Sequence, residues 1–436
     1  MARDPIEARL AAAGLPALPR RAWLEIDLDA LRSNLDTIRR VVGPGVRVEP
    51  VVKADAYGHG AVPVARALGA AGADGLSVAT VDEAFELRED GVELPLLVLY
   101  PIPPEQVAAA AGARIAVSIG AGAPTDAIVE AARVALAAGS PPLDVHLEIE
   151  TGLGRGGALP GELAGALAAI AGGAGVRLAG VWSHLAAAND LAGSRLQDAR
   201  FHAALAPLVD SVELGPATVR RHLAGSGGVL AADVTRWDAV RPGLSTYGLV
   251  PDALTPPGET VADAATLRPA MALLARPVRV TDLPAGHGVS YGPTFTTTRP
   301  SRIATLPVGY GDGWHRILSD RAFALVRGSR VPLVGRVAMD AVMADVTDVP
   351  GERVHEGDEF VLLGSQGGER IGAADLAEAA GTITYEVVTS MSRRLPRVYH
   401  AAGSVKEVRT LAGRRAGWHA SSSGTGTSAT WRSTPS

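Results

Sequence analysis

Short apolar runs alternate with longer helix-like stretches from residue 23 to about residue 250. A short apolar run bounded by turn residues is typical of a buried strand, whereas stretches rich in alanine, leucine, glutamate and arginine favour helices. The alternation therefore predicts repeated β-strand and α-helix units. Candidate strands lie at 48–54, 76–80, 96–100, 115–119, 145–149, 178–184, 219–223 and 240–247.

Helical composition fills the spaces between these runs, and several of the stretches begin with proline near the first turn, which is a common start signal. Strand and helix alternation is compatible with a doubly wound sheet or with an eight-stranded (β/α)8 barrel of the TIM type. Because eight units fit into about 230 residues and no G-x-G-x-x-G follows the first strand, the pattern favours the barrel. Candidate helices lie at 62–71, 81–89, 104–111, 124–138, 160–171 and 195–208.

The pattern changes after about residue 260, where valine- and leucine-rich runs are separated by glycine, proline and aspartate. This predicts a mostly β second domain in which only 371–380 is helical. Near the carboxyl terminus the chain has too few apolar residues for a core. We therefore expect four parts: an extension at 1–20, a barrel at 21–262, a β-rich domain at 263–402 and a disordered tail at 403–436.

Composition and charge narrow the class of protein further. With 47% hydrophobic residues the chain can bury a large interior, which excludes wholesale disorder. A net charge of −5 lacks the basic excess of a nucleic-acid binder, and the absence of cysteine excludes disulfides and cysteine-based zinc sites. We expect no metal site. Since no apolar window of about 18 residues and no signal-peptide pattern is found, we expect no membrane contact and a cytoplasmic location.

One lysine has an unusual position. Lys53 follows Val51 and Val52 in the string VVKADAYGHG, at the end of the first predicted strand. A lysine among buried residues must pair with a charge or lose its proton, and a lowered pKa suits a Schiff-base nucleophile. Active sites of barrels lie at the carboxyl ends of the strands. On the residues alone, a strand-end lysine that reaches solvent is an equally good interpretation.

The whole string VVKADAYGHG resembles the cofactor-lysine signature of alanine racemases, which use pyridoxal 5′-phosphate and consist of a barrel followed by a β-domain. The resemblance implies a cytoplasmic, homodimeric isomerase that interconverts L-alanine and D-alanine and supplies D-alanine for peptidoglycan. Further matches follow in order: WLEIDLDAL at 23–31, TGLGR at 151–155, SHL at 183–185, RPGL at 241–244, VSYG at 289–292, GYGDG at 309–313 followed by Arg316, VGRVAMD at 334–340, YEVV at 385–388 and RRLPRVY at 393–399.

The resemblance also implies catalytic roles. Lys53 would hold the cofactor and act as a base on one face of the substrate Cα in an external aldimine, and Tyr291 would serve the opposite face. Because the family's tyrosine reaches the partner's barrel, the active sites would be shared across the dimer. His184 and Arg241 would support Tyr291. Arg241 would also face the pyridine nitrogen of the cofactor, where a permanent cation weakens the electron sink and suppresses side reactions.

Binding residues are implied in the same way. The cofactor phosphate would be held by Tyr57, Ser226, Gly243, Leu244 and Tyr385. Ser226 follows Gly225, where the family usually has asparagine, so this position departs from the pattern. The substrate would be bound by Arg155, Met339 and Tyr310, and Asp340 would support the subunit interface.

A second departure lies seven residues before Arg155. Many family members have a lysine there whose carbamylation creates an anion that steadies the arginine. This chain has Glu148 instead. Our hypothesis is that Glu148 supplies a permanent negative charge to Arg155, directly or through a water. The alternative is a strand-end acid that never reaches Arg155.

Other functions remain open on the sequence. A broad-specificity or serine-preferring racemase would share the chemistry at Cα and differ only in the space for the side chain. A decarboxylase of related fold would favour a carboxylate rather than Arg241 at the pyridine nitrogen. A non-catalytic carrier of pyridoxal phosphate would lack the second domain that contains Tyr291. In the tail, a partner contact through Arg414, Arg415, Trp418 and His419 is the alternative to disorder.

Overall fold

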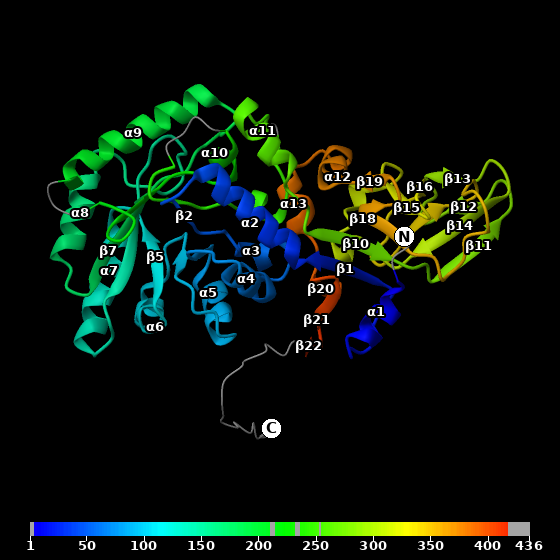
Figure 1. Cartoon of the computed structure of the whole chain (residues 1–436), viewed down its shortest axis with the longest axis horizontal. Coiled ribbons are helices and arrows are strands. Elements are labelled where there is room, and N and C mark those ends of the chain that lie inside the picture. Colours follow the sequence, from blue (N-terminus) through cyan, green and yellow to red (C-terminus); the bar gives the residue numbers. More distant parts are fainter. Residues whose placement is uncertain (1–3, 210–213, 232–235, 253, 417–436) are drawn as a thin grey trace, which may run out of the picture.

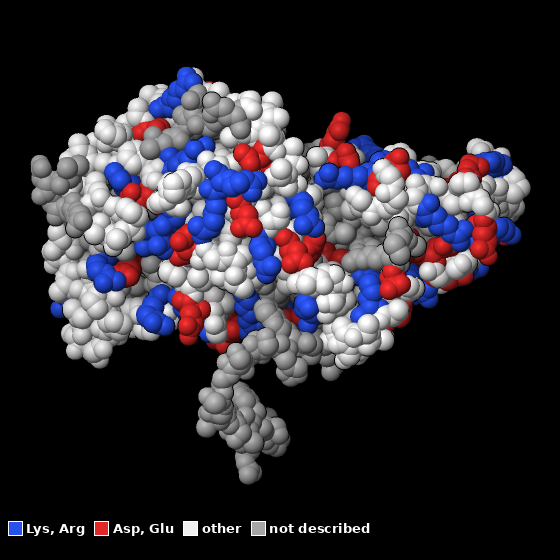
Figure 2. Space-filling model, in the orientation of Figure 1, with Lys and Arg blue, Asp and Glu red and all other residues white. Residues whose placement is uncertain are grey.

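The computed structural model describes residues 4–209, 214–231, 236–252 and 254–416, which form two domains side by side (Figure 1). Among these residues, no helix is both long enough and apolar enough to cross a membrane. Figure 2 shows positive and negative side chains interspersed over one face of the molecule, in keeping with the small net charge.

The first domain is a barrel of parallel strands. Its strand order is β2-β9-β8-β7-β6-β5-β4-β3, and a parallel bridge between Val51 and Ser77 joins the two ends and closes the barrel. Each predicted apolar run contributes one strand, so the predicted barrel is confirmed. The strands are β2 (Arg47–Val48), β3 (Leu76–Val78), β4 (Leu96–Val98), β5 (Ile115–Ile119), β6 (Leu143–Glu148), β7 (Val176–Trp182), β8 (Arg220–His222) and β9 (Ala239–Val240).

Helices surround the barrel, and the six predicted ones are present, α5 with the predicted ends and the other five with shifted ends. They are α4 (Ala61–Ala70), α5 (Val81–Glu89), η1 (Pro104–Gln106) continued by α6 (Val107–Gly112), α7 (Ala123–Ala137), α8 (Leu163–Gly172) and α9 (Leu191–Val209). The structure adds α2 (Leu28–Val42), α3 (Lys53–Tyr57), α10 (Ser226–Leu230), η2 (Leu244–Tyr247) and α11 (Gly258–Ala265).

The largest unpredicted helix is α2. Its buried side chains include Leu31, Leu35 and Ile38, spaced by three or four residues so that they lie on one helix face. The helix begins where the Asp27 side chain accepts a hydrogen bond from the backbone N–H of Ala30 (2.9 Å). The apolar period and the Asp27 cap are both present in the sequence, so this helix could have been predicted.

The second domain is built on one extended mixed sheet. Its path is β11-β14-β17-β16-β15-β18-β10-β1-β20-β21-β22, with β19 paired to β18 and a separate β12-β13 hairpin. The mostly β second domain is therefore confirmed. Its strands are β10 (Met271–Ala275), β11 (Arg279–Leu283), β12 (Gly288–Val289), β13 (Phe295–Thr296), β14 (Ser301–Leu306), β15 (Phe323–Val326), β16 (Ser329–Val334), β17 (Val342–Asp345), β18 (Phe360–Gln366), β19 (Glu369–Ile371), β20 (Arg397–Ala401), β21 (Ser404–Thr410) and β22 (Gly413–Ala416).

The amino-terminal strand belongs to this second sheet. β1 (Ala22–Asp27) pairs antiparallel with β10 and parallel with β20, and Trp23, Leu24 and Ile26 are buried there. The expected start of the barrel at residue 21 is therefore too early, because β1 lies between β10 and β20, two strands of the second domain's sheet. Before it, α1 (Ile6–Ala12) buries Ile6 and Leu10, so the expected extension at 1–20 is partly helical and packed.

Short helices interrupt the second domain. The predicted helix at 371–380 is present as α12 (Ala373–Ala380), and the structure adds α13 (Thr384–Thr389), η3 (Tyr310–Asp312) and η4 (Arg316–Leu318). The expectation of a single helix was wrong because α13 reads TYEVVT, a β-branched string. Thr384 anchors its start, since its backbone N–H and its hydroxyl both donate to the Asp252 carboxylate.

The predicted tail starts too early. β21 and β22 extend the sheet to residue 416, and Val405 and Val408 are buried. Disorder at 403–416 was therefore a wrong expectation, because these few apolar residues gain burial from β20, which lies outside the segment. Arg414 and Arg415 lie in β22. Trp418, His419 and the remainder of the tail lie outside the described residues.

Candidate active site

A cavity of about 570 Å³ opens at the carboxyl ends of the barrel strands, where active sites of this architecture lie. The structure brings eight of the expected residues to its wall, together with Trp182 and Tyr100. The eight are Lys53, Tyr57, Arg155, His184, Ser226, Arg241, Gly243 and Tyr385.

Lys53 lies in a left-handed turn after β2, which ends at Val48, earlier than the strand predicted at 48–54. The backbone φ angles of Ala54, Asp55, Ala56 and Tyr57 are 52°, 54°, 53° and 53°. A residue with a Cβ pays about 1–2 kcal/mol for this conformation. The turn is therefore strained and must be held by its surroundings.

Contacts from distant segments hold the turn. The Ala54 N–H donates to Glu83 (2.6 Å), and the Arg397 Nε donates to the Gly58 carbonyl (2.9 Å). The Tyr399 hydroxyl donates to the His59 carbonyl (3.1 Å). Because Arg397 and Tyr399 come from β20, the second domain's sheet fixes the backbone that carries Lys53.

The charge of Lys53 is disfavoured in this position. Burial lowers its pKa, the guanidinium groups of Arg155 and Arg241 lower it further, and Glu83 acts in the opposite direction. A neutral amine is the form that attacks a carbonyl carbon or accepts a proton. Lys53 therefore has the surroundings of a nucleophile and base.

The wall near Gly243 fits a phosphate group. The Ser226 hydroxyl oxygen accepts hydrogen bonds from the backbone N–H groups of Gly243 (2.9 Å) and Ser245 (3.1 Å). A Cβ on Gly243 would lie 2.4 Å from the Tyr57 hydroxyl, so only glycine leaves room here. The Tyr385 ring lies 6.0 Å from that of Tyr57. Hydroxyl groups can donate to a phosphate, so Tyr57, Ser226 and Tyr385 around the close backbone of Gly243 fit the expected cofactor. Leu244, also expected there, is fully buried next to Gly243.

Arg241 is the buried cation of the site. Its guanidinium donates to the Ser183 carbonyl (2.8 Å) and to Nδ1 of His222, and it lies over the Trp182 ring at 4.6 Å. Burial lowers the pKa of Arg241 to about 10, and the Glu49 and Glu148 carboxylates oppose this shift. At neutral pH the group is therefore cationic.

His184 lies beside three cationic groups. Its pKa falls to about 3, first because burial disfavours the imidazolium and then because Arg241, Arg155 and Lys53 repel it. The imidazole is therefore neutral at physiological pH and has one donor and one acceptor nitrogen.

Glu148 contacts Arg155 directly. Glu148 Oε1 and Arg155 Nη2 are 3.1 Å apart, with side-chain exposures of 10% and 34%. The Arg155 guanidinium also lies over the rings of Tyr100 (5.4 Å) and Trp182 (5.9 Å). Burial raises the pKa of the Glu148 carboxyl, while the Arg155 hydrogen bond and charge lower it. The predicted contact is thus direct and needs no bridging water.

Tyr385 is on the cavity wall, but the other expected residues of the second domain lie elsewhere. Tyr291, Met339 and Tyr310 have exposed fractions of 74%, 52% and 44%, and none lines the cavity. Tyr291 follows β12, which Figure 1 shows at the end of the molecule away from the barrel. Asp340 pairs with Arg394 in the same domain. Within one chain, the two predicted bases are therefore not brought together.

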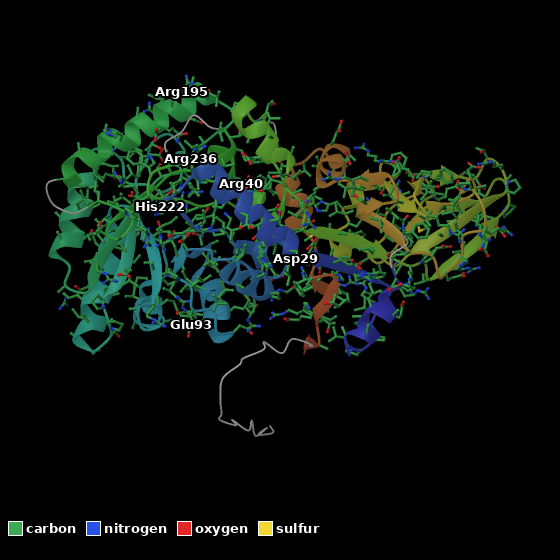
Figure 3. All side chains as sticks on the ribbon, in the orientation of Figure 1. Asp29, Arg40, Glu93, Arg195, His222 and Arg236 are labelled. Carbon is green, nitrogen blue, oxygen red and sulfur yellow. The ribbon has the colours of Figure 1, made fainter. Side chains whose placement is uncertain are left out.

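Sequence reasoning missed several residues of the site. Trp182 lies against both Arg155 and Arg241, and its indole N–H donates to Ser118 (2.8 Å). His222 lies inside the barrel domain (Figure 3) and accepts from Arg241. Trp182 and His222 are the last residues of β7 and β8, and this strand-end position was the available signal.

Comparison with known proteins identifies the family. The model of the alanine racemase N-terminal domain matches residues 26–251, and that of the C-terminal domain matches residues 270–399. The alanine racemase of Desulfosudis oleivorans is 40% identical over 400 residues, which are 89% of this chain and 98% of the relative.

Solved structures agree with this assignment. The alanine racemase of Bacillus anthracis with bound L-Ala-P has a TM-score of 0.81 and 35% identity, covering 91% of this chain and 99% of that chain. The alanine racemase of Bartonella henselae, with covalently bound pyridoxal phosphate, has a TM-score of 0.74 and 28% identity, covering 88% and 100% of the two chains. The chain therefore belongs to the alanine racemase family of isomerases.

Proposed function

We propose that this chain interconverts L-alanine and D-alanine with pyridoxal 5′-phosphate, using Lys53 and Tyr291 as the two bases. The observation that carries the proposal is the position of Lys53 in the barrel cavity, with a lowered pKa and with Arg155 and Arg241 as neighbours. Racemisation requires that one group removes the Cα proton and a second group returns a proton to the opposite face.

The cofactor would be held by residues that already line the cavity. Tyr57, Ser226, Gly243, Leu244 and Tyr385 would bind its phosphate, Lys53 Nζ would attach it, and Arg241 would lie at its pyridine nitrogen. When bound, the cofactor supplies an electron sink that makes the substrate Cα–H acidic. The cationic Arg241 keeps that sink weak, which favours return of the proton to Cα.

Arg155 would bind the substrate carboxylate. A guanidinium offers several donors in one plane, so it can pair with Glu148 on one side and with a substrate carboxylate on the other. Glu148 holds one edge of Arg155 at 3.1 Å and thereby orients the rest of the group. Lys53 Nζ then transfers the proton on one face of Cα.

The second base requires another copy of the chain. Tyr291 is 74% exposed and does not line the cavity of its own chain. In a homodimer the partner's Tyr291 would reach the opposite face of Cα, with Met339 and Tyr310 near the substrate and Asp340 at the interface. His184 and Arg241 would favour the phenolate of this tyrosine. We place the enzyme in the cytoplasm, where its D-alanine would serve peptidoglycan synthesis.

Isotope exchange tests this function. The cofactor-loaded protein is incubated with L-alanine in deuterium oxide, and D-alanine and Cα deuterium are followed by chiral chromatography and mass spectrometry. Formation of Cα-deuterated D-alanine is the expected result. Conversion of L-serine at a higher kcat/KM would favour the serine-preferring racemase, and absence of exchange on every amino acid would support a cofactor carrier.

A further inference from the structure

A row of polar side chains runs through the barrel from the active site to its opposite end. Arg241 contacts Nδ1 of His222, and Nε2 of His222 lies 2.8 Å from Nδ1 of His146. Nε2 of His146 lies 3.3 Å from a terminal nitrogen of Arg220. Both histidines are fully buried. The row therefore links the cationic group of the site to the first residue of β8.

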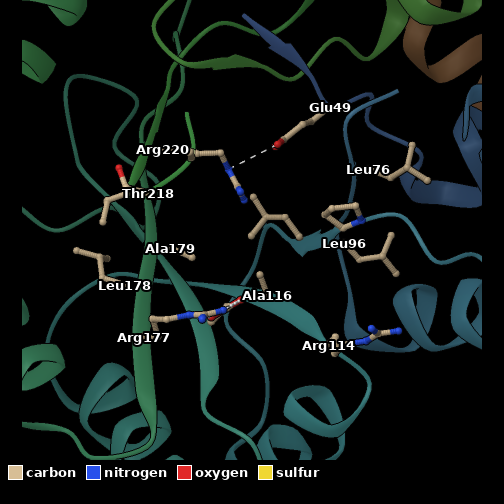
Figure 4. A pocket seen from close by; sticks show the side chains of 15 residues that line it. Glu49, Leu76, Leu96, Arg114, Ala116, Arg177, Leu178, Ala179, Thr218 and Arg220 are labelled. Carbon is tan, nitrogen blue, oxygen red and sulfur yellow. Dashed lines mark hydrogen bonds and ion pairs between the residues drawn. The ribbon is translucent and has the colours of Figure 1, made fainter. Parts of the chain in front are cut away.

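The far end of the row lies at a second cavity. This cavity of about 600 Å³ is lined by the amino-terminal ends of barrel strands, and Arg220 and Glu49 are on its wall (Figure 4). Glu49 Oε1 lies 3.6 Å from Arg220 Nε, and the two side chains are 4% and 20% exposed. Glu49 therefore attracts the Arg220 guanidinium at Nε, next to the terminal nitrogen that contacts His146, while the same Glu49 oxygen accepts from Arg47 Nε (3.1 Å).

The row contains one proton too many. Guanidinium nitrogens only donate, and a neutral imidazole carries one N–H and one acceptor nitrogen. Both histidines are neutral, because burial and the neighbouring arginines hold their pKa values well below 6.5. Each of the three contacts needs one proton, but two arginines and two imidazoles bring four. One contact must therefore place two N–H groups face to face.

The distances indicate where this repulsion falls. The contact between the histidines is 2.8 Å, whereas that between His146 and Arg220 is 3.3 Å, the longest in the row. If the longest contact is the repulsive one, the surplus proton is at Arg220, Nε2 is protonated and Nδ1 is bare in both rings. In this arrangement His222 can accept from Arg241. If both rings changed tautomer, the repulsion would move to Arg241.

We propose that Arg220 and Glu49 are positioning residues for Arg241, acting through the tautomers of His146 and His222. The Glu49 carboxylate competes with His146 for the Arg220 guanidinium, which leaves the repulsive contact at the cavity and the attractive contact at Arg241. The Glu49 carboxylate also favours the charged form of Arg241 electrostatically. The expected effect on catalysis rests on the proposed function, whereas the tautomers of His146 and His222 do not depend on it.

The test uses the holoenzyme with ¹⁵N-labelled histidine. Magic-angle-spinning ¹⁵N spectra distinguish bare from protonated ring nitrogens, and His146→Gln and His222→Gln variants assign the signals. In the wild type we expect bare Nδ1 and protonated Nε2 in both rings. The reverse pattern would overturn the proposal by itself, whether or not the enzyme racemises alanine.

Variants then test the cause. In Glu49→Gln, Arg220 is free to donate to His146, so we expect Nδ1 of His222 to become protonated and kcat to fall about tenfold, with KM for alanine little changed. In Glu49→Gln/Arg220→Met the competing donor is gone, so the wild-type tautomers and most of kcat should return. An unchanged His222 signal in Glu49→Gln, or a double variant that behaves like Glu49→Gln, would refute the proposal.

Discussion

Removal of the Glu148 charge is the sharpest test of substrate binding. Glu148→Gln keeps the shape and the acceptor oxygen but removes the negative charge 3.1 Å from Arg155. A hydrogen bond to a charged group contributes about 1.5–3 kcal/mol, and in Glu148→Gln the bond keeps one charged partner, Arg155, so its contribution falls towards the lower end of this range. Because the Arg155 side chain is 34% exposed, solvent screens part of this difference. We therefore expect Glu148→Gln to weaken the interaction that orients Arg155 by about 1 kcal/mol.

Two effects of this change oppose each other. Loss of orientation raises KM for alanine, and about 1 kcal/mol corresponds to roughly fivefold. Loss of the carboxylate also leaves a stronger positive field, which would lower KM. We expect the loss of orientation to dominate the change in KM. Solvent screens the charge of the partly exposed Arg155 guanidinium, so the change in the field is small, whereas the orientation of the group depends directly on Glu148.

Steady-state kinetics in both directions provide the assay. Glu130→Gln is the matched control, since Glu130 and Arg133 form a similar pair (2.6 Å) on the exposed surface of α7. We expect KM to rise about fivefold in Glu148→Gln and to stay unchanged in Glu130→Gln. An unchanged or lower KM in Glu148→Gln would refute the positioning role.

Three further results are expected. On acidification the free energy of unfolding should fall between about pH 6.5 and pH 4, because His59 and His184, with folded pKa values of about 4 and 3, take up protons only after unfolding. Urea midpoints at pH 7 and pH 5 measure this loss, and a flat profile contradicts it. Gly243→Ala should weaken cofactor binding at least tenfold in an absorbance titration, since its Cβ would lie 2.4 Å from the Tyr57 hydroxyl, whereas Gly165→Ala, with open space around it, should not. Truncation after residue 402 should lower the melting temperature by several degrees, because it removes β21, whereas truncation after residue 416 should leave it unchanged.

The barrel strands could be predicted because each is a short run of apolar residues, a pattern that is visible within the segment itself. The turn at Lys53 could not, since four residues with side chains adopt positive φ only because Glu83, Arg397 and Tyr399 hold them. In the same way, β1 depends on β10 and β20, which come from distant parts of the chain. Pairing of this kind leaves no periodic signal in the strand itself.

The same distinction applies to the candidate site, where some residues could be recognised from the sequence alone and others only through the family resemblance. Lys53 stood out as a lysine in an apolar run, but roles for Arg155, Tyr57 and Tyr291 came from the family resemblance. The contact between Glu148 and Arg155 was a hypothesis from the same resemblance, since Glu148 stands where many family members have a lysine, and the structure shows the contact directly. His146 lies inside β6 and gave no signal, because a histidine within a barrel strand has no distinctive spacing until the fold places its ring beside that of His222.

Mixing inactive subunits tests the shared site most directly. Lys53→Ala and Tyr291→Phe homodimers are each expected to be inactive. When the two are dissociated and reassociated in equal amounts, half of the dimers are mixed, and each mixed dimer has one site with both an intact Lys53 and the partner's Tyr291. We expect racemase activity to return to about one quarter of the wild-type value. No recovery in verified mixed dimers would contradict the proposed pairing of Lys53 with the partner's Tyr291.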